Sequence, residues 1–225
     1  MKKKRLIITI DGPSGAGKST ISKILAEKLH FTYIDTGAMY RCVGLEAGKQ
    51  QVRTDDPDGL SRICQQIAIQ FKWEQGINRV FCNGTEVTKQ IRTPEMDMMA
   101  SAVSKVPAVR KAMVSLQRNL AGNRRAILEG RDAGTVIFPD AELKIYLEAS
   151  PLARGKRRHL EQLQRGLDVS LDATVEEMKQ RDHNDSSREH SPLLMAADAH
   201  LLDTTTMDIN AVVTAITALV KEIEQ

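Results

Sequence analysis

The sequence predicts an α/β fold built on a five-stranded parallel sheet, with one small antiparallel insert. Five short apolar runs lie at residues 6–10, 32–35, 126–129, 143–147 and 199–203. Segments with a helical spacing of apolar residues separate them, and this alternation is typical of parallel strands joined by crossover helices. At 225 residues, we expect 1–225 to form a single domain that carries an inserted subdomain.

The first apolar run leads directly into a glycine-rich motif. It has the form G-x-x-x-x-G-K-[ST], and residues 20–29 follow it with helical apolar spacing. Between a strand and a helix, such a motif wraps its backbone N–H groups around the phosphates of a nucleoside triphosphate. Lysine then reaches the β- and γ-phosphates, and the serine hydroxyl holds Mg²⁺. The motif consists of Gly12, Pro13, Ser14, Gly15, Ala16, Gly17, Lys18 and Ser19.

The segment between the second and third apolar runs breaks the alternation. Residues 67–73 alternate between apolar and polar, turn at 74–76, continue as 77–82, and turn again at Asn83-Gly84. This pattern predicts a small antiparallel meander. Two helices are expected next, over about 94–105 and 107–120, with a break at Pro107. We interpret about 61–105 as an inserted subdomain.

Helix starts are marked by capping residues. Thr93 and Ser150 each precede a proline, which is typical of an N-cap followed by the first helical residue. Thr174 with Glu177 forms a potential capping box. The last helix, from about Asp208, is expected to bury six apolar residues, which are Val212, Val213, Ile216, Leu219, Val220 and Ile223.

Composition narrows the class of protein. The formal net charge is only +3, and four Phe, three Tyr and one Trp offer little stacking surface, which argues against a nucleic-acid-binding protein. No segment is long and apolar enough to predict a membrane span. Three widely spaced cysteines are expected to be buried thiols in the reducing cytoplasm. The absence of coiled-coil heptads favours a monomer.

The phosphate-binding motif leaves the reaction open. The chain has no N-K-x-D guanine-binding motif and no glutamine clearly placed to orient water, which argues against a GTPase switch. Arginines are clustered instead. Arg154, Arg157 and Arg158 lie on one expected helix, and Arg181, Asp185 and Arg188 share a face of another if that helix continues. These clusters are either solvated faces with ordinary ion pairs, or the cations that a phosphoryl transferase needs.

Further motifs resemble the bacterial cytidylate kinase (CMP/dCMP kinase) family. They are Asp-Thr-Gly-Ala-Met-Tyr-Arg at 35–41, Ile-Arg-Thr at 91–93, Gly-Arg-Asp-Ala-Gly-Thr-Val at 130–136, Arg181-Asp182, and Ser-Pro-Leu at 191–193. The resemblance runs in order along nearly the whole chain. It implies a P-loop kinase fold with a nucleotide-monophosphate-binding insert and a mobile helical lid at about 151–170. It also implies transfer of the γ-phosphoryl group of ATP to CMP or dCMP with Mg²⁺.

The resemblance also implies roles for individual residues. Gly12 to Thr20 would hold ATP, and Ser19 would hold the metal. The acceptor phosphate would be held by Thr36, Arg41, Arg131, Arg181 and Arg188. Ser101, Arg110 and Asp132 would face the cytosine, and Asp185 the sugar hydroxyls. Lys18, Arg131, Arg154, Arg158 and Arg181 would act on the transferring phosphoryl group.

Simpler roles compete with several of these assignments. Asp132 is suited to accept from the cytosine amino group, but it is equally suited to pair with Arg131 or another arginine. Ser101 would otherwise be a surface hydroxyl, Arg110 a solvated side chain, and Thr36 the N-cap of a helix from Ala38. Glu129 stands where the family usually has Asp, so we do not include it as a metal ligand. Other acceptors for a P-loop kinase are UMP, AMP or a non-nucleotide such as shikimate.

Overall fold

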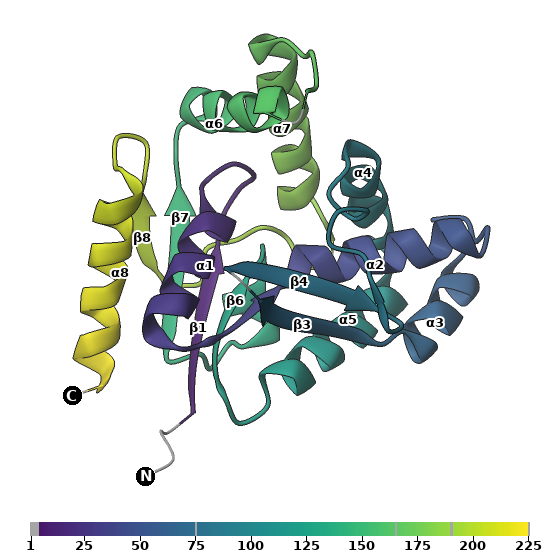
Figure 1. The fold of residues 1–225 in the computed structure, drawn as a ribbon, viewed down its shortest axis with the longest axis horizontal. Coiled ribbons are helices and arrows are strands. Elements are labelled where there is room, and N and C mark those ends of the chain that lie inside the picture. Colours follow the sequence, from purple (N-terminus) through teal and green to yellow (C-terminus); the bar gives the residue numbers. More distant parts are fainter. Residues whose placement is uncertain (1–4, 75, 165, 190, 225) are drawn as a thin grey trace. The chain divides into compact units, whose positions relative to one another are not determined.

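The computed structural model describes residues 5–74, 76–164, 166–189 and 191–224, which divide into two compact units. The first unit joins the residues up to Thr32 to those from Arg124 onward, and the second is Tyr33–Asn123. Figure 1 labels the helices and strands of both units. The second unit contains residues 61–105, and the boundaries of the insert and of the lid remain predictions.

The large sheet has the strand order β2-β6-β1-β7-β8. Its strands are β1 (Leu6–Asp11), β2 (Thr32–Asp35), β6 (Arg125–Glu129), β7 (Leu143–Glu148) and β8 (His200–Asp203), so all five predicted strands are confirmed. In the middle strand, Ile8 pairs in parallel with Ile127 on one side and Leu143 on the other. Since β1 has later strands on both sides, its carboxyl end lies where strand order reverses, the usual ligand position in such sheets.

Helices of the first unit cover this sheet and extend beyond it. They are α1 (Lys18–Leu29), α6 (Pro151–Gln164), α7 (Leu171–Ser186) and α8 (Ile209–Glu224), with a π-helical turn, η1, at Ala133–Ile137. Helices α1 and α8 pack against each other and against strands of the sheet, whereas α6 and α7 pack mainly on one another (Figure 1). The loop between β1 and α1 therefore begins at the centre of the sheet.

Two details of the helix predictions are wrong. Thr174 is not an N-cap: α7 begins at Leu171, and the Ser170 hydroxyl oxygen accepts from the Ala173 amide at 3.1 Å. Thr174 lies one turn inside the helix, where its hydroxyl donates to Gln162 of α6 at 2.8 Å. In α8, four of the six predicted residues are buried, but Leu219 is half-buried and Ile223 is exposed. Apolar spacing predicts the buried face of a helix but not how far along the helix its neighbours extend.

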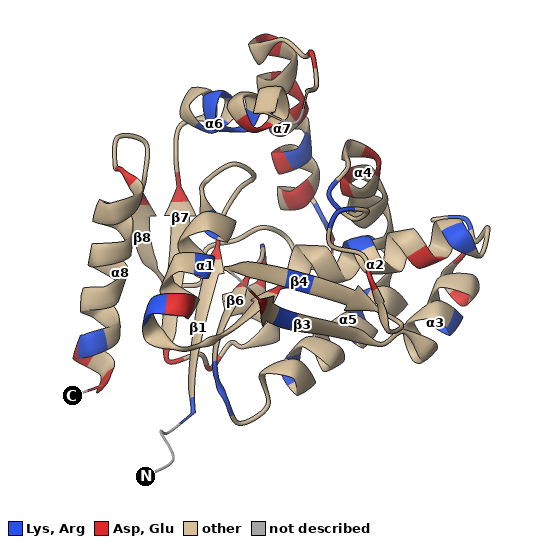
Figure 2. Cartoon of the chain, in the orientation of Figure 1, with Lys and Arg blue, Asp and Glu red and all other residues tan. Residues whose placement is uncertain are grey.

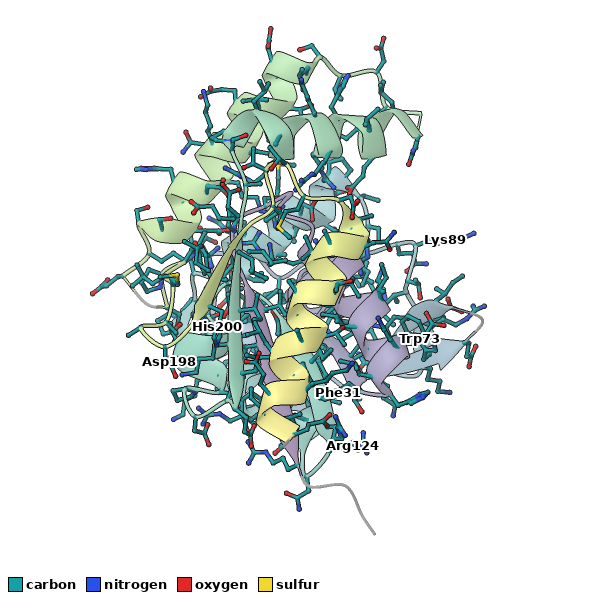
Figure 3. The ribbon with its side chains drawn as sticks, turned by 90° about the vertical axis from the view of Figure 1, so that its left-hand side faces the viewer. Phe31, Trp73, Lys89, Arg124, Asp198 and His200 are labelled. Atoms are coloured by element: carbon teal, nitrogen blue, oxygen red, sulfur yellow. The ribbon has the colours of Figure 1, made fainter. Side chains whose placement is uncertain are left out.

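The second unit contains the predicted meander. Strands β3 (Ile69–Glu74), β4 (Ile77–Cys82) and β5 (Thr85–Glu86) form an antiparallel sheet in that order, with Trp73 exposed on β3 (Figure 3). Strand β3 begins two residues later than predicted because Ile67 is the C-cap of the preceding helix. The helices of this unit are α2 (Thr36–Lys49), α3 (Pro57–Gln66), α4 (Pro94–Val103) and α5 (Pro107–Ala121).

Local signals in the sequence are confirmed at several points. The Thr93 hydroxyl oxygen accepts from the Met96 amide at 3.2 Å, and Ser150 does the same for Ala153 at 3.3 Å. The break before Pro107 also occurs as predicted. Cys42 and Cys82 are buried free thiols, whereas Cys64 is only half-buried. Within the described ranges, no helix has both the length and the apolar character needed to cross a membrane.

Candidate active site

Glycines shape the loop between β1 and α1. Gly12, Gly15 and Gly17 have φ angles of 143°, 73° and 91°. A Cβ atom on Gly12 would lie 2.0 Å from the Leu147 carbonyl oxygen of β7, so only glycine lets the loop pass this strand. Gly17 then leads into α1 without a side-chain cap. The loop thus presents an open helix N-terminus, the geometry that binds phosphate.

Cations gather around this loop. The Lys18 side chain is buried, and its Nζ donates to the Pro13 carbonyl oxygen at 2.6 Å. Burial lowers the pKa of Lys18 well below its usual value, and the positive charges of Arg131 and Arg181 lower it further. A buried lysine with two further positive charges near it favours a bound anion.

Ser19 and Glu129 form a pair of oxygen donors beside the loop. The Ser19 hydroxyl donates to Glu129 Oε1 at 2.7 Å, and Glu129 is a buried residue at the end of β6. No cluster of three or more His, Cys, Asp or Glu residues that could hold a metal occurs in the described parts of the chain. Mg²⁺ bound to a nucleotide needs only one or two protein oxygens, because phosphates and waters supply the rest. The pair therefore fits a nucleotide-bound Mg²⁺, and Glu129 is a residue that sequence reasoning left out.

Asp185 joins two of the predicted phosphate-binding arginines. Its Oδ2 accepts from Arg131 Nε at 2.8 Å, and its Oδ1 accepts from Arg188. Burial opposes ionisation of Asp185, but Arg131, Arg188 and Arg181 outweigh it and hold the pKa of Asp185 below its usual value. Helix α7 ends at Ser186, so Arg188 lies just beyond the helix rather than on its face. Asp132 is buried directly before η1, and the Nε of the neighbouring Arg131 donates to Asp185.

Arg154 is held against the phosphate-binding loop. Its Nη1 donates to the Ser14 carbonyl oxygen at 2.9 Å and also to Asp182 of α7. The other oxygen of Asp182 accepts from the Ser14 amide at 3.1 Å. Arg158, one turn later on α6, pairs instead with Glu161 at 3.4 Å, and Figure 2 shows both charge signs along α6 and α7. Sequence reasoning missed Asp182: the Arg181-Asp182 motif was used for the family resemblance, but Asp182 was given no role.

The second unit holds a separate group of predicted site residues at the start of α2. Asp35, not Thr36, caps this helix: its Oδ1 accepts from the Ala38 amide at 2.8 Å. Its Oδ2 accepts from Arg92 Nη2 at 2.5 Å. Burial opposes ionisation of Asp35, but Arg92 and Arg41 outweigh it and lower the pKa of Asp35 to about 2. Thr36 is the first residue of the helix and is buried, so its interpretation as the N-cap is wrong.

Arg41, Ser101 and Arg110 belong to the helices of the same unit. Arg41 Nε donates to Asp97 of α4 at 2.8 Å. Arg110 is buried, with its guanidinium 5.7 Å from the centre of the Tyr40 ring, so its interpretation as a solvated side chain is wrong. Ser101 is half-buried on α4.

Comparison with known proteins gives one consistent result. The sequence model of a family described as cytidylate kinase matches residues 8–222. A cytidylate kinase of Syntrophotalea carbinolica is 47% identical over 222 residues, covering 99% of this chain and 94% of the relative. One from Geobacter sulfurreducens is 45% identical over 99% of this chain and 96% of the relative. One from Bacillus cereus is 45% identical over 96% of each chain.

Solved structures are more distant. A shikimate kinase from Bacteroides thetaiotaomicron aligns over 96% of this chain and 98% of its own, with 11% identity and a TM-score of 0.47. The cytidylate kinase sequences, by contrast, are 45–47% identical over 96–99% of this chain. The chain belongs to the cytidylate kinase family.

Proposed function

We propose that this chain transfers the γ-phosphoryl group of ATP to the 5′-phosphate of CMP or dCMP, forming ADP and CDP or dCDP. One observation carries the proposal: the buried Lys18 ammonium lies in the loop, where its Nζ donates to the Pro13 carbonyl oxygen at 2.6 Å, and burial together with the charges of Arg131 and Arg181 lowers its pKa. Phosphoryl transfer requires this kind of charge, because its transition state spreads negative charge over the equatorial oxygens.

The acceptor needs no general base. The attacking group is a phosphate oxygen, and a phosphate monoester is mostly doubly ionised near neutral pH. Lys18 would neutralise the β- and γ-phosphates of ATP bound by residues 12–20, and Arg131 would hold the attacking phosphate. The work of the protein is therefore to position two anions against their mutual repulsion.

Mg²⁺ would be held by Ser19, with the Glu129 carboxylate beside it. When bound, the ion would neutralise charge on the β- and γ-phosphate oxygens. Glu129 accepts the Ser19 hydroxyl hydrogen, so it orients the hydroxyl oxygen that would meet the ion.

The remaining predicted residues would bind the acceptor and complete the site. Thr36, Arg41 and Arg188 would contact the acceptor phosphate, and Ser101, Arg110 and Asp132 the cytosine. An ionised Asp132 would accept from the cytosine amino group and repel the O4 acceptor of uracil. Asp185 would face the sugar, although both of its oxygens already accept from arginines.

Arg154, Arg158 and Arg181 would close over the transferring group, with about 151–170 acting as the mobile lid. Closure would exclude water and so prevent loss of ATP by hydrolysis. We further propose that the enzyme acts as a monomer in the cytoplasm, where its free thiols stay reduced and its substrates are small nucleotides.

An acceptor panel tests this function. Diphosphate formation would be measured with Mg·ATP and each of CMP, dCMP, UMP, AMP and GMP, beside a control without acceptor. We expect turnover on CMP and dCMP well above the others, with little hydrolysis in the control. Turnover mainly on another acceptor would contradict the roles of Ser101, Arg110 and Asp132. Rapid hydrolysis without acceptor would contradict the kinase function.

A further inference from the structure

Asp11, the last residue of β1, is a buried carboxylate that none of the roles above uses. Its Oδ1 accepts from the Ala133 amide at 2.9 Å, and its Oδ2 accepts from the Gly134 amide at 2.7 Å. Burial raises the pKa of Asp11 to about 6, while the two amides oppose this shift. The carboxylate is therefore mostly ionised at neutral pH, where both hydrogen bonds are charge-assisted.

These bonds replace a cap that the turn lacks. The turn η1 begins after Asp132, but the Asp132 side chain makes no capping bond to it. Asp11 supplies that bond from a neighbouring strand. An N-cap residue usually caps the turn with its own side chain. Here the Asp11 carboxylate accepts from the first two amides of the turn, so the Asp132 carboxylate is not used for capping.

Arg131 and Asp132 are thereby bracketed by two anchors on β1. On one side, the Gly130 amide donates to the Ile10 carbonyl oxygen at 3.1 Å. On the other side are the two bonds to Asp11. Only the second anchor depends on a side chain, so a substitution can remove it while the strand pairing stays in place.

We propose that Asp11 is a positioning residue for the acceptor nucleotide, fixing the segment that carries Arg131 and Asp132. This inference rests on the proposed function, because it gives those two residues the acceptor as their ligand. This role acts through the Ala133 and Gly134 amides and requires no contact between Asp11 and the reacting atoms.

Packing of the turn against β1 leaves little room at Gly134. A Cβ atom on Gly134 would lie 2.8 Å from Thr9 Oγ1, 3.3 Å from Lys144 Cδ and 3.4 Å from Asp11 Oδ2. Thr9 and Asp11 are two residues apart on β1, so both side chains face the turn from the same side. A side chain at position 134 should therefore push the turn away from β1 and disturb the two acceptor-binding residues that precede the turn.

The test is Asp11→Asn, measured with CMP, UMP and ATP. Asparagine keeps the size but turns an N–H group toward one of the two amides. We expect the KM for CMP to rise about tenfold, as for one lost charge-assisted hydrogen bond, and the KM for ATP to change less than about threefold. The preference for CMP over UMP should fall as well. An equal rise in the KM for CMP and the KM for ATP, or an unchanged KM for CMP, would overturn the proposal.

Glu142→Gln is the matched control. Glu142 Oε2 accepts from the Ile7 amide at 2.8 Å, so it is another carboxylate bonded to backbone, at the opposite end of the same strand. We expect both KM values to stay within about twofold of wild type. An absence of CMP turnover in the wild-type enzyme would contradict the proposed function itself. A wild-type enzyme that turns over CMP, with an Asp11→Asn variant that has an unchanged KM for CMP, would contradict only the role of Asp11.

A second pair of variants decides the matter if Asp11→Asn does not fold. Gly134→Ala should raise the KM for CMP selectively, because its methyl group meets Thr9 Oγ1. Adding Thr9→Ala removes that contact and should restore most of the affinity for CMP. A normal KM for CMP in Gly134→Ala, or no restoration by Thr9→Ala, would contradict the proposal that contacts of this turn with β1 position Arg131 and Asp132.

Discussion

Asp185→Asn should destabilise the protein strongly, because one carboxylate holds two arginines. The Asp185 side chain is 3% exposed, and those of Arg131 and Arg188 are 18% and 10% exposed. Removing the charge leaves two guanidinium groups beside the same site with little access to water and no neutralising carboxylate there. Removing one member of a buried ion pair costs about 3–5 kcal/mol. Asparagine retains one acceptor oxygen, so we expect about 3 kcal/mol.

The loss should depend on pH in one direction. The folded-state pKa of Asp185 lies below its usual value of 3.8, so ionised Asp185 stabilises the folded state above about pH 4. This stabilisation disappears as the pH falls through the lowered pKa. The difference between wild type and Asp185→Asn should therefore be largest near neutral pH and shrink in acid.

Thermal unfolding followed by circular dichroism at pH 7 and pH 3.5 measures both effects. For a chain of this size, about 3 kcal/mol corresponds to a fall in Tm of about 6–12 °C. Asp55→Asn is the control: Asp55 pairs with Arg53 at 2.6 Å, but both side chains are largely exposed. Its Tm should equal that of wild type. A fall of less than about 3 °C for Asp185→Asn at pH 7, or a difference that grows in acid, would refute the reasoning.

Three further substitutions test the site. Lys18→Ala should lower kcat at least about 100-fold with an unchanged far-UV spectrum, and near-normal turnover would exclude its role at the phosphates. Asp132→Asn should lower the ratio of kcat/KM for CMP over UMP about tenfold, whereas an unchanged ratio would remove Asp132 from base recognition. Asp182→Asn frees Arg154 from a competing carboxylate, so the KM for ATP should fall about twofold to fivefold. A rise would mean that Asp182 positions Arg154 instead.

The sheet and the loop were predictable because their signals are local. Strand β1 is buried on both faces, so its sequence is a continuous apolar run that stands out without knowledge of its neighbours. The glycines from Gly12 to Gly17 signal a tight loop by residue type alone, and the structure gives all three of them positive φ angles. The capping bonds of Thr93 and Ser150 likewise involve residues only three positions apart.

What sequence reasoning missed depends on long-range contacts. Thr174 has the spacing of a capping box, yet Ser170 starts the helix and Thr174 contacts α6. Asp11 meets Ala133 at a separation of 122 residues, and Ser14 meets Asp182 at 168. Patterns over a short stretch of sequence cannot predict pairs of residues that are more than 100 positions apart. They follow from which strands and helices become neighbours after folding.

Carboxylates account for most of what was missed, and there is a physical reason. The predicted phosphate-binding arginines would repel one another in a folded chain without ligand. Arg131 and Arg188 meet Asp185, Arg154 meets Asp182, and Arg41 meets Asp97. A bound phosphate offers the same kind of oxygen to the same guanidinium groups. The acidic residues therefore neutralise the arginines in the chain without ligand, and under the proposed function a bound nucleotide would take over one or more of these arginines from their carboxylates.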